Sequence, residues 1–375
     1  MADNFQIRDV FNSKVINELA DRLAIAWDGF SKEKFTKTIL PKLNELTYSE
    51  RSKLITDALE TYLPNDFPAA VNILLKAQLP AYSSDVLENT TDRFITVPQS
   101  AFISRNGVAY FDVSMQALYE MTQRFTAEWD IRIFLETYPD KTLAVLKKWA
   151  TDDNPHVRRL VSEGSRPFLP WGKRLHAFKE NPNPTLELLD ILKNDPSDYV
   201  RRSVANHLND HAKNHPDLIV KTLKKWKNEH PGKNMDKLIR HATRTLVKNG
   251  HSGALELIGF KKGALVKVAH FNIDKKITTG EYLHFSFDLI STADKTQNIV
   301  IDYVIYFKKS DGSLSPKVFK MTTRKLDKNE TVNLKKKHSF KVITTRTYYP
   351  GKHKLAIQVN GEEKATADFL LQSNH

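Results

Sequence analysis

The sequence has 375 residues, 40% of them hydrophobic and 27% charged, which is typical of a globular protein long enough for two domains. It contains no cysteine, which excludes disulfides, thiolate nucleophiles and cysteine metal sites. Because it lacks an apolar run of about 18 residues and the basic-then-apolar start of a signal peptide, we expect a cytoplasmic protein without a membrane partner. The net charge of +13 makes a polyanion the leading partner class, although many soluble proteins are simply basic.

The first part of the chain is amphipathic at helical spacing. Residues 15–40 and 48–63 carry apolar residues at intervals of three and four, with polar residues between them. We therefore expect helix pairs here, with weaker repeat character than in the segments that follow.

From Val71 to about Phe260 the apolar residues continue at helical spacing, and the segments break at Pro, Asn and Asp. Three segments align, and each predicts a helix, a polar turn and a second helix that begins with an aliphatic residue and Arg. The intervals of 43 residues from Arg158 to Arg201 and 39 residues from Arg201 to Arg240 are typical of HEAT-like repeats, which stack into a curved solenoid. The three segments are Ala144–Val161, Glu187–Val204 and Lys221–Thr243.

Two of these repeats double the arginine, as Arg158-Arg159 and Arg201-Arg202. A repeated Arg can pair with an Asp of the neighbouring repeat and hold the stack together, or it can face the concave groove as part of a ladder of cations. Adjacent helical residues point about 100° apart, so pairing alone does not explain the doubling, and one Arg of each pair should face the groove. An Asp in the preceding turn, such as Asp153, can cap the second helix.

After Gly263 the pattern changes to the alternation of β-strands. Five to seven short strands are separated by turn signals such as Asp311-Gly312 and Asn360-Gly361, which suggests a small immunoglobulin-like β-sandwich. The fold class is thus α + β multidomain, with a HEAT-like helical solenoid over residues 1–260 and the sandwich over 261–375. The second part holds 21 basic and 11 acidic side chains. Its lysines either contact a polyanion or only protect strand edges from pairing.

Carboxylate, aromatic and guanidinium side chains gather around the repeat turns, whereas no motif of a metal site, a P-loop, a dinucleotide fold or a nucleophilic serine is present. Glu163 and Arg159 are four residues apart, so they share a helix face. Pro167 and Pro170 stiffen a loop that presents Trp171, although a Trp is more often a core residue.

The helix that begins at Arg201-Arg202 carries the second group of candidate residues. Asn206, His207 and Asp210 are placed on one face of it. An Asp near a helix C-terminus opposes the helix dipole, so Asp210 needs another reason to be there.

Three segments together resemble the signature of the bacterial alkylpurine DNA glycosylases of the AlkC type, relatives of AlkD. They are "RFTAEWDIRIFLETYPD", "WATDDNPHVRRLVSEGSRPFLPWGKRL" and "DPSDYVRRSVANHLNDHAKNHPD". The resemblance covers roughly residues 70 to 260, and the β-rich tail is similar to the immunoglobulin-like domain of some members. Phe168 departs from the pattern, where a basic residue is frequent, and so does His211, where an aliphatic one is frequent. Both departures bear on substrate choice.

The resemblance implies a monofunctional DNA glycosylase that needs no cofactor. Such an enzyme hydrolyses the N-glycosidic bond of cationic N3-alkylated bases, such as 3-methyladenine and 3-methylcytosine, in duplex DNA, as a step of base excision repair. It also implies a kinked duplex whose lesion base is not swung fully into a pocket, and we expect a monomer associated with the bacterial nucleoid. The alternative is a non-catalytic HEAT-like scaffold for DNA or an acidic protein, but Glu163 and Asp210 in its groove would weaken a phosphate clamp.

Site residues are carried over from the same resemblance. Asp210 is assigned to the sugar cation or the water, Glu163 to the lesion or the water, Trp171 to the face of the sugar or base, and Glu128 to closing the site. The implied DNA-binding residues are Arg159, Arg166, Lys173, Arg174, Arg201, Arg202, Asn206 and His207.

Overall fold

The computed structural model of the chain describes residues 6–83, 91–343 and 346–373. These residues form two compact units, Met1–Asn214 and His215–His375. Among the described helices, none combines the length and the apolar character that crossing a bilayer requires.

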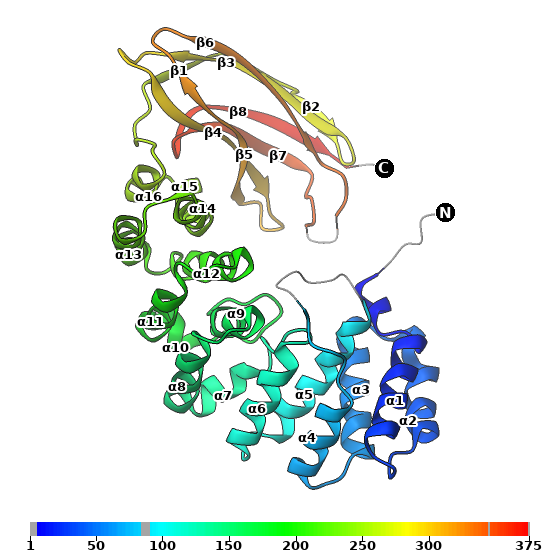
Figure 1. Cartoon of the computed structure of the whole chain (residues 1–375). Coiled ribbons are helices and arrows are strands. Elements are labelled where there is room, and N and C mark those ends of the chain that lie inside the picture. Colours follow the sequence, from blue (N-terminus) through cyan, green and yellow to red (C-terminus); the bar gives the residue numbers. More distant parts are fainter. Residues whose placement is uncertain (1–5, 84–90, 344–345, 374–375) are drawn as a thin grey trace. The chain divides into compact units, whose positions relative to one another are not determined.

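The first unit is helical, and Figure 1 shows its helices stacked side by side in chain order. Among the described residues, the 3-10 helix Ile7–Val10 precedes the first α-helix, and two others, Leu40–Glu45 and Thr91–Ile95, lie between later ones. The α-helices are α1 Ser13–Ala26, α2 Lys32–Ile39, α3 Tyr48–Tyr62, α4 Phe67–Lys76, α5 Thr96–Asn106, α6 Phe111–Thr122, α7 Ile131–Thr137, α8 Pro139–Trp149, α9 Pro155–Gly164, α10 His176–Glu180, α11 Asn183–Leu192 and α12 Asp198–His211.

The repeat predicted from the sequence appears as helix–turn–helix pairs, α8 with α9 and α11 with α12. The buried faces of α9 and α12 pack on each other through aliphatic residues such as Leu160 and Val204, both 0% exposed. Helix α9 ends at Gly164. A Cβ on this glycine would lie 2.5 Å from Cγ2 of Ile131, so only glycine allows α7 to approach this closely.

The helix caps differ from the expectation in one respect. The N-cap of α9 is Asn154, whose side chain accepts a hydrogen bond from the backbone N–H of His156, and not Asp153. Asp195, in the corresponding turn before α12, accepts from the backbone N–H of Ser197 and also binds an arginine, described below. The turn carboxylate therefore links repeats as well as shaping its own turn.

The second unit begins with four helices and continues with eight strands. The helices are α13 Pro216–Glu229, α14 Lys233–Ala242, α15 Arg244–Lys248 and α16 Ser252–Leu257. The strands are β1 Val266–Ile273, β2 Lys276–Thr278, β3 Tyr282–Ser291, β4 Gln297–Lys308, β5 Leu314–Leu326, β6 Thr331–Ser339, β7 Gly351–Val359 and β8 Glu362–Gln372. The third aligned segment is thus also a helix pair, α13 with α14.

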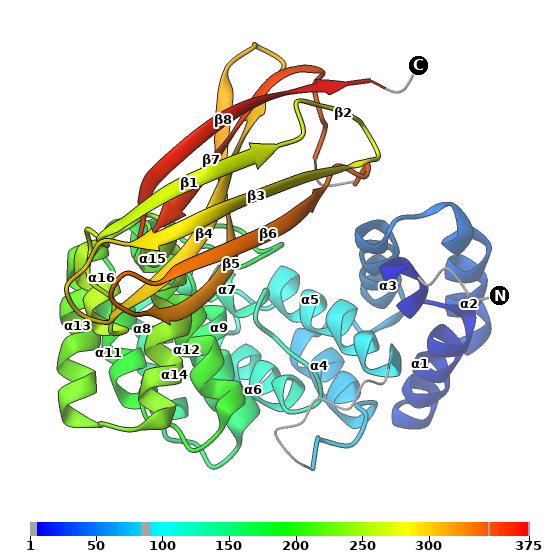
Figure 2. The ribbon, with the colours of Figure 1, turned by 90° about the horizontal axis from the view of Figure 1, so that it is seen from above.

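The strands form two sheets, of order β1-β3-β6 and β2-β8-β7-β4-β5. Figures 1 and 2 show the three-stranded sheet lying over the five-stranded one. Every strand pair is antiparallel except β2 with β8. Alternate residues of the facing strands, such as Phe287, Ile301 and Ile357, are buried between the sheets. This is the β-sandwich that the alternation predicts, with eight strands in place of five to seven.

The outer side of β4 explains why the last helices group with the strands. Val300 points away from the sandwich core and packs with Leu255 of α16 and with Phe260. The change from helix to strand falls between Leu257 and Val266, while the division into compact units comes earlier, after Asn214. A domain boundary near residue 260 remains a prediction.

Candidate functional site

The first arginine of each doubled pair has the same structural role in both repeats. Arg158 and Arg201 each donate from Nη1 to two backbone carbonyls, those of the residues five and six positions earlier, and so close the turn before their own helix. Arg158 also donates from Nε and Nη2 to the two carboxylate oxygens of Asp195, at 2.6 and 3.0 Å. The expectation that Arg201 reaches DNA phosphates is not supported, because this side chain is buried and occupied by its own turn.

The second arginines differ from each other. Arg159 pairs with Glu128, with 2.8 Å between Nη1 and Oε2, and its guanidinium lies 4.9 Å from the ring centre of Tyr199. Burial lowers the pKa of Arg159, but Glu128 and other neighbours outweigh burial and raise it. Arg202 is exposed and lies 3.7 Å from the carboxylate of Asp198. Arg202 faces solvent, whereas Arg159 is largely buried and pairs with Glu128, so a phosphate contact by Arg159 stays a prediction.

Arg166 joins the two predicted catalytic carboxylates. Its Nε donates to Oδ2 of Asp210 at 2.9 Å, and its Nη1 donates to Oε1 of Glu163. All three residues are less than a tenth exposed. Breaking such a buried ion cluster by removing one member leaves an uncompensated charge, which is costly. Glu163 and Arg159 share a helix face, but their ion pairs are with different residues, Glu163 with Arg166 and Arg159 with Glu128.

Two further side chains complete this cluster. The Ser203 hydroxyl donates to Oε2 of Glu163 at 2.6 Å, and Lys213 Nζ donates to Oδ1 of Asp210 at 3.0 Å. Burial would raise the pKa of Glu163, but the guanidinium groups of Arg159 and Arg166 and the Ser203 hydroxyl lower it below its usual range. Glu163 is therefore ionised at neutral pH. Asp210 is not a lone carboxylate at a helix end, because two cations hold it.

His207 is buried next to Ser162, the residue before Glu163, and does not face solvent. It is 0% exposed, its Nδ1 lies 2.9 Å from the backbone oxygen of Ser162, and its ring stacks on His211 with 4.8 Å between ring centres. Burial, followed by the charge of neighbouring groups, lowers the pKa of His207 well below its usual value, so the ring is neutral. A DNA contact by His207 is not supported by this position. Asn206, one residue earlier, is half-buried.

Trp171 is presented to solvent. It is 80% exposed and its backbone has a φ of 61°, a left-handed conformation that residues other than glycine adopt rarely. The core position that is commoner for a Trp is therefore wrong here. The same loop carries Lys173, which binds Glu136 at 2.8 Å, and the exposed Arg174.

A recess of about 580 Å³ lies beside Trp171 in the same helical unit. Its walls include the rings of Tyr48, Trp129 and Trp171, and Asp130 is part of its lining. Ser104 donates to the Asp130 carboxyl at 2.8 Å. Burial, above all, raises the pKa of Asp130 to about 6.

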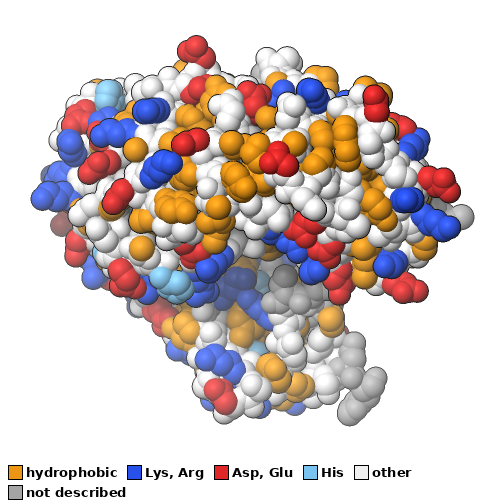
Figure 3. Space-filling model, turned by 90° about the horizontal axis from the view of Figure 1, so that it is seen from below, with side chains coloured by type: hydrophobic (Ala, Val, Ile, Leu, Met, Phe, Trp, Pro, Cys, Tyr) orange, Lys and Arg blue, Asp and Glu red, His pale blue; other side chains and the backbone are white. Residues whose placement is uncertain are grey.

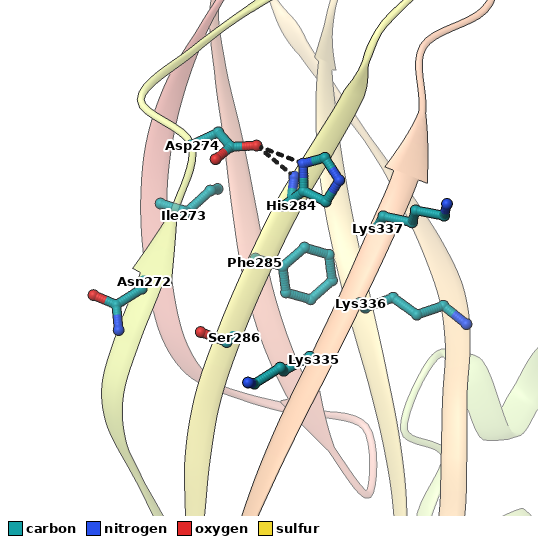
Figure 4. Close-up of a pocket in the computed structure, with 9 residues that line it drawn as sticks. All are labelled: Asn272, Ile273, Asp274, His284, Phe285, Ser286, Lys335, Lys336 and Lys337. Atoms are coloured by element: carbon teal, nitrogen blue, oxygen red, sulfur yellow. Dashed lines mark hydrogen bonds and ion pairs between the residues drawn. The ribbon is translucent and has the colours of Figure 1, made fainter.

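The second unit has a recess of its own, of about 570 Å³, on the three-stranded sheet. Figure 4 shows His284 of β3 bound to Asp274, and the consecutive lysines Lys335, Lys336 and Lys337 of β6 beside Phe285. The three lysines pair in register with residues 284–286 of β3 and are exposed. The recess therefore has an ammonium-rich edge, while Phe285, which also lines it, is 4% exposed and belongs to the sandwich core.

Elsewhere the charges are mixed. Over most of the helical surface drawn in Figure 3, Lys and Arg side chains are interspersed with Asp, Glu and hydrophobic side chains. Among the described side chains of this face, no broad patch has one sign of charge. No group of three or more His, Cys, Asp or Glu that could hold a metal ion occurs within the described ranges.

The structure thus brings together Glu163, Asp210 and Arg166, with Trp171 on the loop that follows Arg166. Sequence reasoning missed Ser203, Lys213 and Arg132, which bind this cluster or its loop. Arg132 had a signal, since it stands in the segment "EWDIR" that helped to carry the resemblance. The other two had none, because a serine and a lysine at these positions are ordinary helix and turn residues.

Comparison with known proteins agrees with this architecture. The family model of DNA alkylation repair enzymes matches residues 99–246, and that of the C-terminal Ig-like domain of the uncharacterised protein YhaZ matches residues 267–373. A helical DNA alkylation repair domain followed by an Ig-like domain is therefore the class that the fold and the site define.

Two full-length relatives narrow this class. The chain is 38% identical over 376 residues to the uncharacterised protein YhaZ of Bacillus subtilis (strain 168), covering 98% of this chain and 99% of the relative. It is 35% identical to the Pseudomonas fluorescens alkylpurine DNA glycosylase AlkC, whose structure is of a complex with DNA containing an abasic site analogue. That match has a TM-score of 0.89 and covers 98% of this chain and 100% of the other. The chain belongs to the AlkC-type family of DNA alkylation repair enzymes and has a DNA glycosylase fold.

Proposed function

We propose that this protein is a monofunctional glycosylase that removes cationic N3-alkylated bases, such as 3-methyladenine and 3-methylcytosine, from duplex DNA. The observation that carries the proposal is the pair of carboxylates, Glu163 and Asp210, joined by Arg166 at the start of the loop that exposes Trp171. The similar Pseudomonas protein is an alkylpurine DNA glycosylase, which supports the same reaction class here.

The chemistry asks for little acid catalysis. In an N3-alkylated nucleoside the base already bears a positive charge, so the bond between C1′ and the base nitrogen can break with its electron pair passing to the base. The sugar then takes on oxocarbenium character, and a water oxygen bonds to C1′ while the water proton passes to a carboxylate of the site, for which Asp210 is the candidate. Fixed carboxylates stabilise the developing cation best where water is scarce, and Asp210 and Glu163 are both nearly buried.

Access to Asp210 requires a rearrangement at its edge. The carboxylate is 2% exposed, with Oδ2 held by Arg166 and Oδ1 held by Lys213. The Lys213 side chain is 43% exposed, so a DNA phosphate can compete for its ammonium group. We infer that such a phosphate draws Lys213 away and frees Oδ1 for the sugar or the water. Trp171 then offers its ring to the sugar or the cationic base.

DNA binding is assigned to cations that face solvent. In the helical unit these include Lys173, Arg174, Arg202 and Lys213, and in the β-rich unit the lysines at 335–337 of Figure 4. Binding of this kind neutralises phosphates, positions the duplex and weakens with salt. A kinked duplex, with the base not swung fully into a pocket, fits a site built from a buried carboxylate cluster and an exposed ring.

The test is a direct assay of base release. The full-length protein is incubated with duplex DNA methylated by a simple alkylating agent, and released bases are separated and identified by chromatography and mass spectrometry. We expect free 3-methyladenine or 3-methylcytosine and an abasic site, and no strand cleavage of the lyase type. DNA binding without release of any alkylated base would favour the scaffold alternative.

A further inference from the structure

The loop that follows α9 is held by one buried arginine of an earlier helix, Arg132 of α7. Arg132 is 2% exposed and donates from Nη1 to the backbone oxygens of Gly164 and Arg166, at 2.8 Å each. From Nε it donates at 2.8 Å to the backbone oxygen of Lys173, which also accepts from Nη2. One guanidinium thus binds both ends of residues 164–173.

No carboxylate forms a salt bridge with Arg132 within the described ranges of the chain. Burial lowers its pKa to about 10, which still leaves the side chain charged at neutral pH. A buried cation that serves carbonyl groups alone is expensive unless all its donors are used. The buried charge of Arg132 fixes a loop that carries two residues of the proposed site, Arg166 and Trp171.

The backbone of the loop is strained at Trp171, whose φ is 61°. A left-handed backbone at a bulky, largely exposed residue persists only where its surroundings determine it. Trp129, three residues before Arg132, adds a bond from its indole Nε1 to the backbone oxygen of Pro170 at 3.2 Å. Gly172 packs against the guanidinium, since a Cβ there would lie 3.4 Å from Nε of Arg132. Trp129 and Arg132 therefore bind backbone carbonyls of the loop both before the strained Trp171, at positions 164, 166 and 170, and after it, at position 173.

We propose that Arg132 is a positioning residue of the glycosylase site, which holds Arg166 between the carboxylates and Trp171 in its exposed orientation. It touches no substrate itself and acts through these two residues. The proposal rests on the proposed function, because its main readout is base excision. Displacement of a positioned group by about 1 Å can cost on the order of a hundredfold in rate.

The test compares Arg132→Lys with a matched control, Arg51→Lys. Arg51 is 5% exposed and donates to the backbone oxygens of Arg8, Phe11 and Leu46. It thus has the same kind of carbonyl bonds far from the loop in sequence, although it also lies 3.8 Å from the carboxylate of Asp9. We expect both variants to lower the melting temperature, and only R132K to lower the single-turnover excision rate, by about ten- to a hundredfold. Equal excision rates in the two variants would overturn the proposal.

A double-mutant cycle separates positioning from general damage. In a Trp171→Ala background, R132K should lower the excision rate further by less than about threefold, because part of what Arg132 positions is already absent. An undiminished loss in that background would show that Arg132 does not act through Trp171. If R132K does not fold, Gly172→Ala replaces it in the test with the same expectations. Its added Cβ would lie 3.4 Å from Nε of Arg132 and so disturbs the same contact less than R132K does.

A third measurement keeps the proposal testable without excision. Hydrogen exchange read by mass spectrometry should show faster exchange in peptides covering residues 165–175 of R132K, and not in those of R51K. If the wild-type protein releases no base, the proposed function fails while the exchange result still decides whether Arg132 holds the loop. Unchanged exchange in that segment would refute the loop-holding role itself.

Discussion

Arg158 of α9 and Asp195, in the turn before α12, form a two-point ion pair that joins consecutive helical repeats, with N–O distances of 2.6 and 3.0 Å. Both side chains are largely buried, at 11% and 3% exposed. For Arg158, the pair favours the first of the two alternatives, an ion pair with an Asp of the neighbouring repeat. Arg201, the first arginine of the other doublet, instead closes its own turn and lies 3.3 Å from Asp198 of its own helix.

Loss of this pair should cost stability and not DNA binding. Arg158→Ala leaves the buried carboxylate of Asp195 without its cation, so we expect the free energy of unfolding to fall by about 3 kcal/mol. Chemical denaturation checks the loss, and the double variant Arg158→Met with Asp195→Asn should recover part of it. A variant that melts like the wild type but binds DNA with a flatter salt dependence would instead make Arg158 a phosphate ligand.

Asp210→Asn should separate chemistry from binding. The amide keeps the shape of the side chain and removes its charge, so the single-turnover excision rate should fall by about a hundredfold or more. Affinity for a duplex with an uncharged abasic-site analogue should change little. Equal losses of rate and of affinity would make Asp210 a structural residue only. Glu187→Gln, on the exposed side of α11, is a suitable control.

The exposed and the buried arginines should differ in their salt dependence. Arg174→Ala or Arg202→Ala should weaken binding to any DNA sequence and flatten the plot of log affinity against log salt by about one unit if one phosphate contact is lost. Arg201→Ala should instead lower the melting temperature, because its guanidinium closes a turn. The opposite pattern, with only Arg201 affecting the slope, would contradict this assignment of roles.

The sequence predicted those parts of the fold that have a repeating pattern of residues. The spacing of Arg158 and Arg201 predicted the helix pairs, and alternation after Gly263 predicted the sandwich. Partners across the cluster could not be predicted, because Arg166 meets Asp210 from 44 positions away, and the i, i+4 spacing places Glu163 and Arg159 on one face without showing that Arg159 pairs with Glu128. The burial of His207, Arg166 and Arg201 could not be predicted either. From the sequence alone, a histidine or arginine near a site is expected to face solvent, and only the packing shows that it does not.

Asp130 gives the stability of the protein a distinct dependence on pH. Its pKa is about 6 when folded, mainly because of burial, against 3.8 as the ordinary value. The folded state therefore favours the protonated carboxyl, so this residue costs nothing below about pH 4 and increasingly destabilises the fold as the pH rises through 6. The difference amounts to about 3 kcal/mol at neutral pH.

Asp130→Asn should remove that cost while its amide oxygen still accepts from Ser104. We expect the variant to unfold at higher denaturant concentration than the wild type at pH 7.5, and at nearly the same concentration at pH 4. Asp112→Asn, whose side chain is 88% exposed, is the control and should show no such difference. A gain in stability that is equal at both pH values would contradict the role of ionisation.

The lysines of β6 provide the test of whether the β-rich unit contacts DNA. Lys335, Lys336 and Lys337 lie together at the open recess of Figure 4, with Lys337 also 4.7 Å from the ring centre of Tyr282. If they bind phosphates, their triple replacement by Gln should lower the affinity for duplex DNA strongly at physiological salt and reduce the salt slope by up to about three. Single-turnover excision from saturated complexes should be largely kept, since the carboxylate cluster lies in the other unit.

The matched control replaces Lys352, Lys354 and Lys364 of β7 and β8 by Gln, because these lysines contact Asp368, the Tyr306 ring and Glu362. Equal and small effects of both triple variants would mean that the β6 lysines only keep an edge strand soluble.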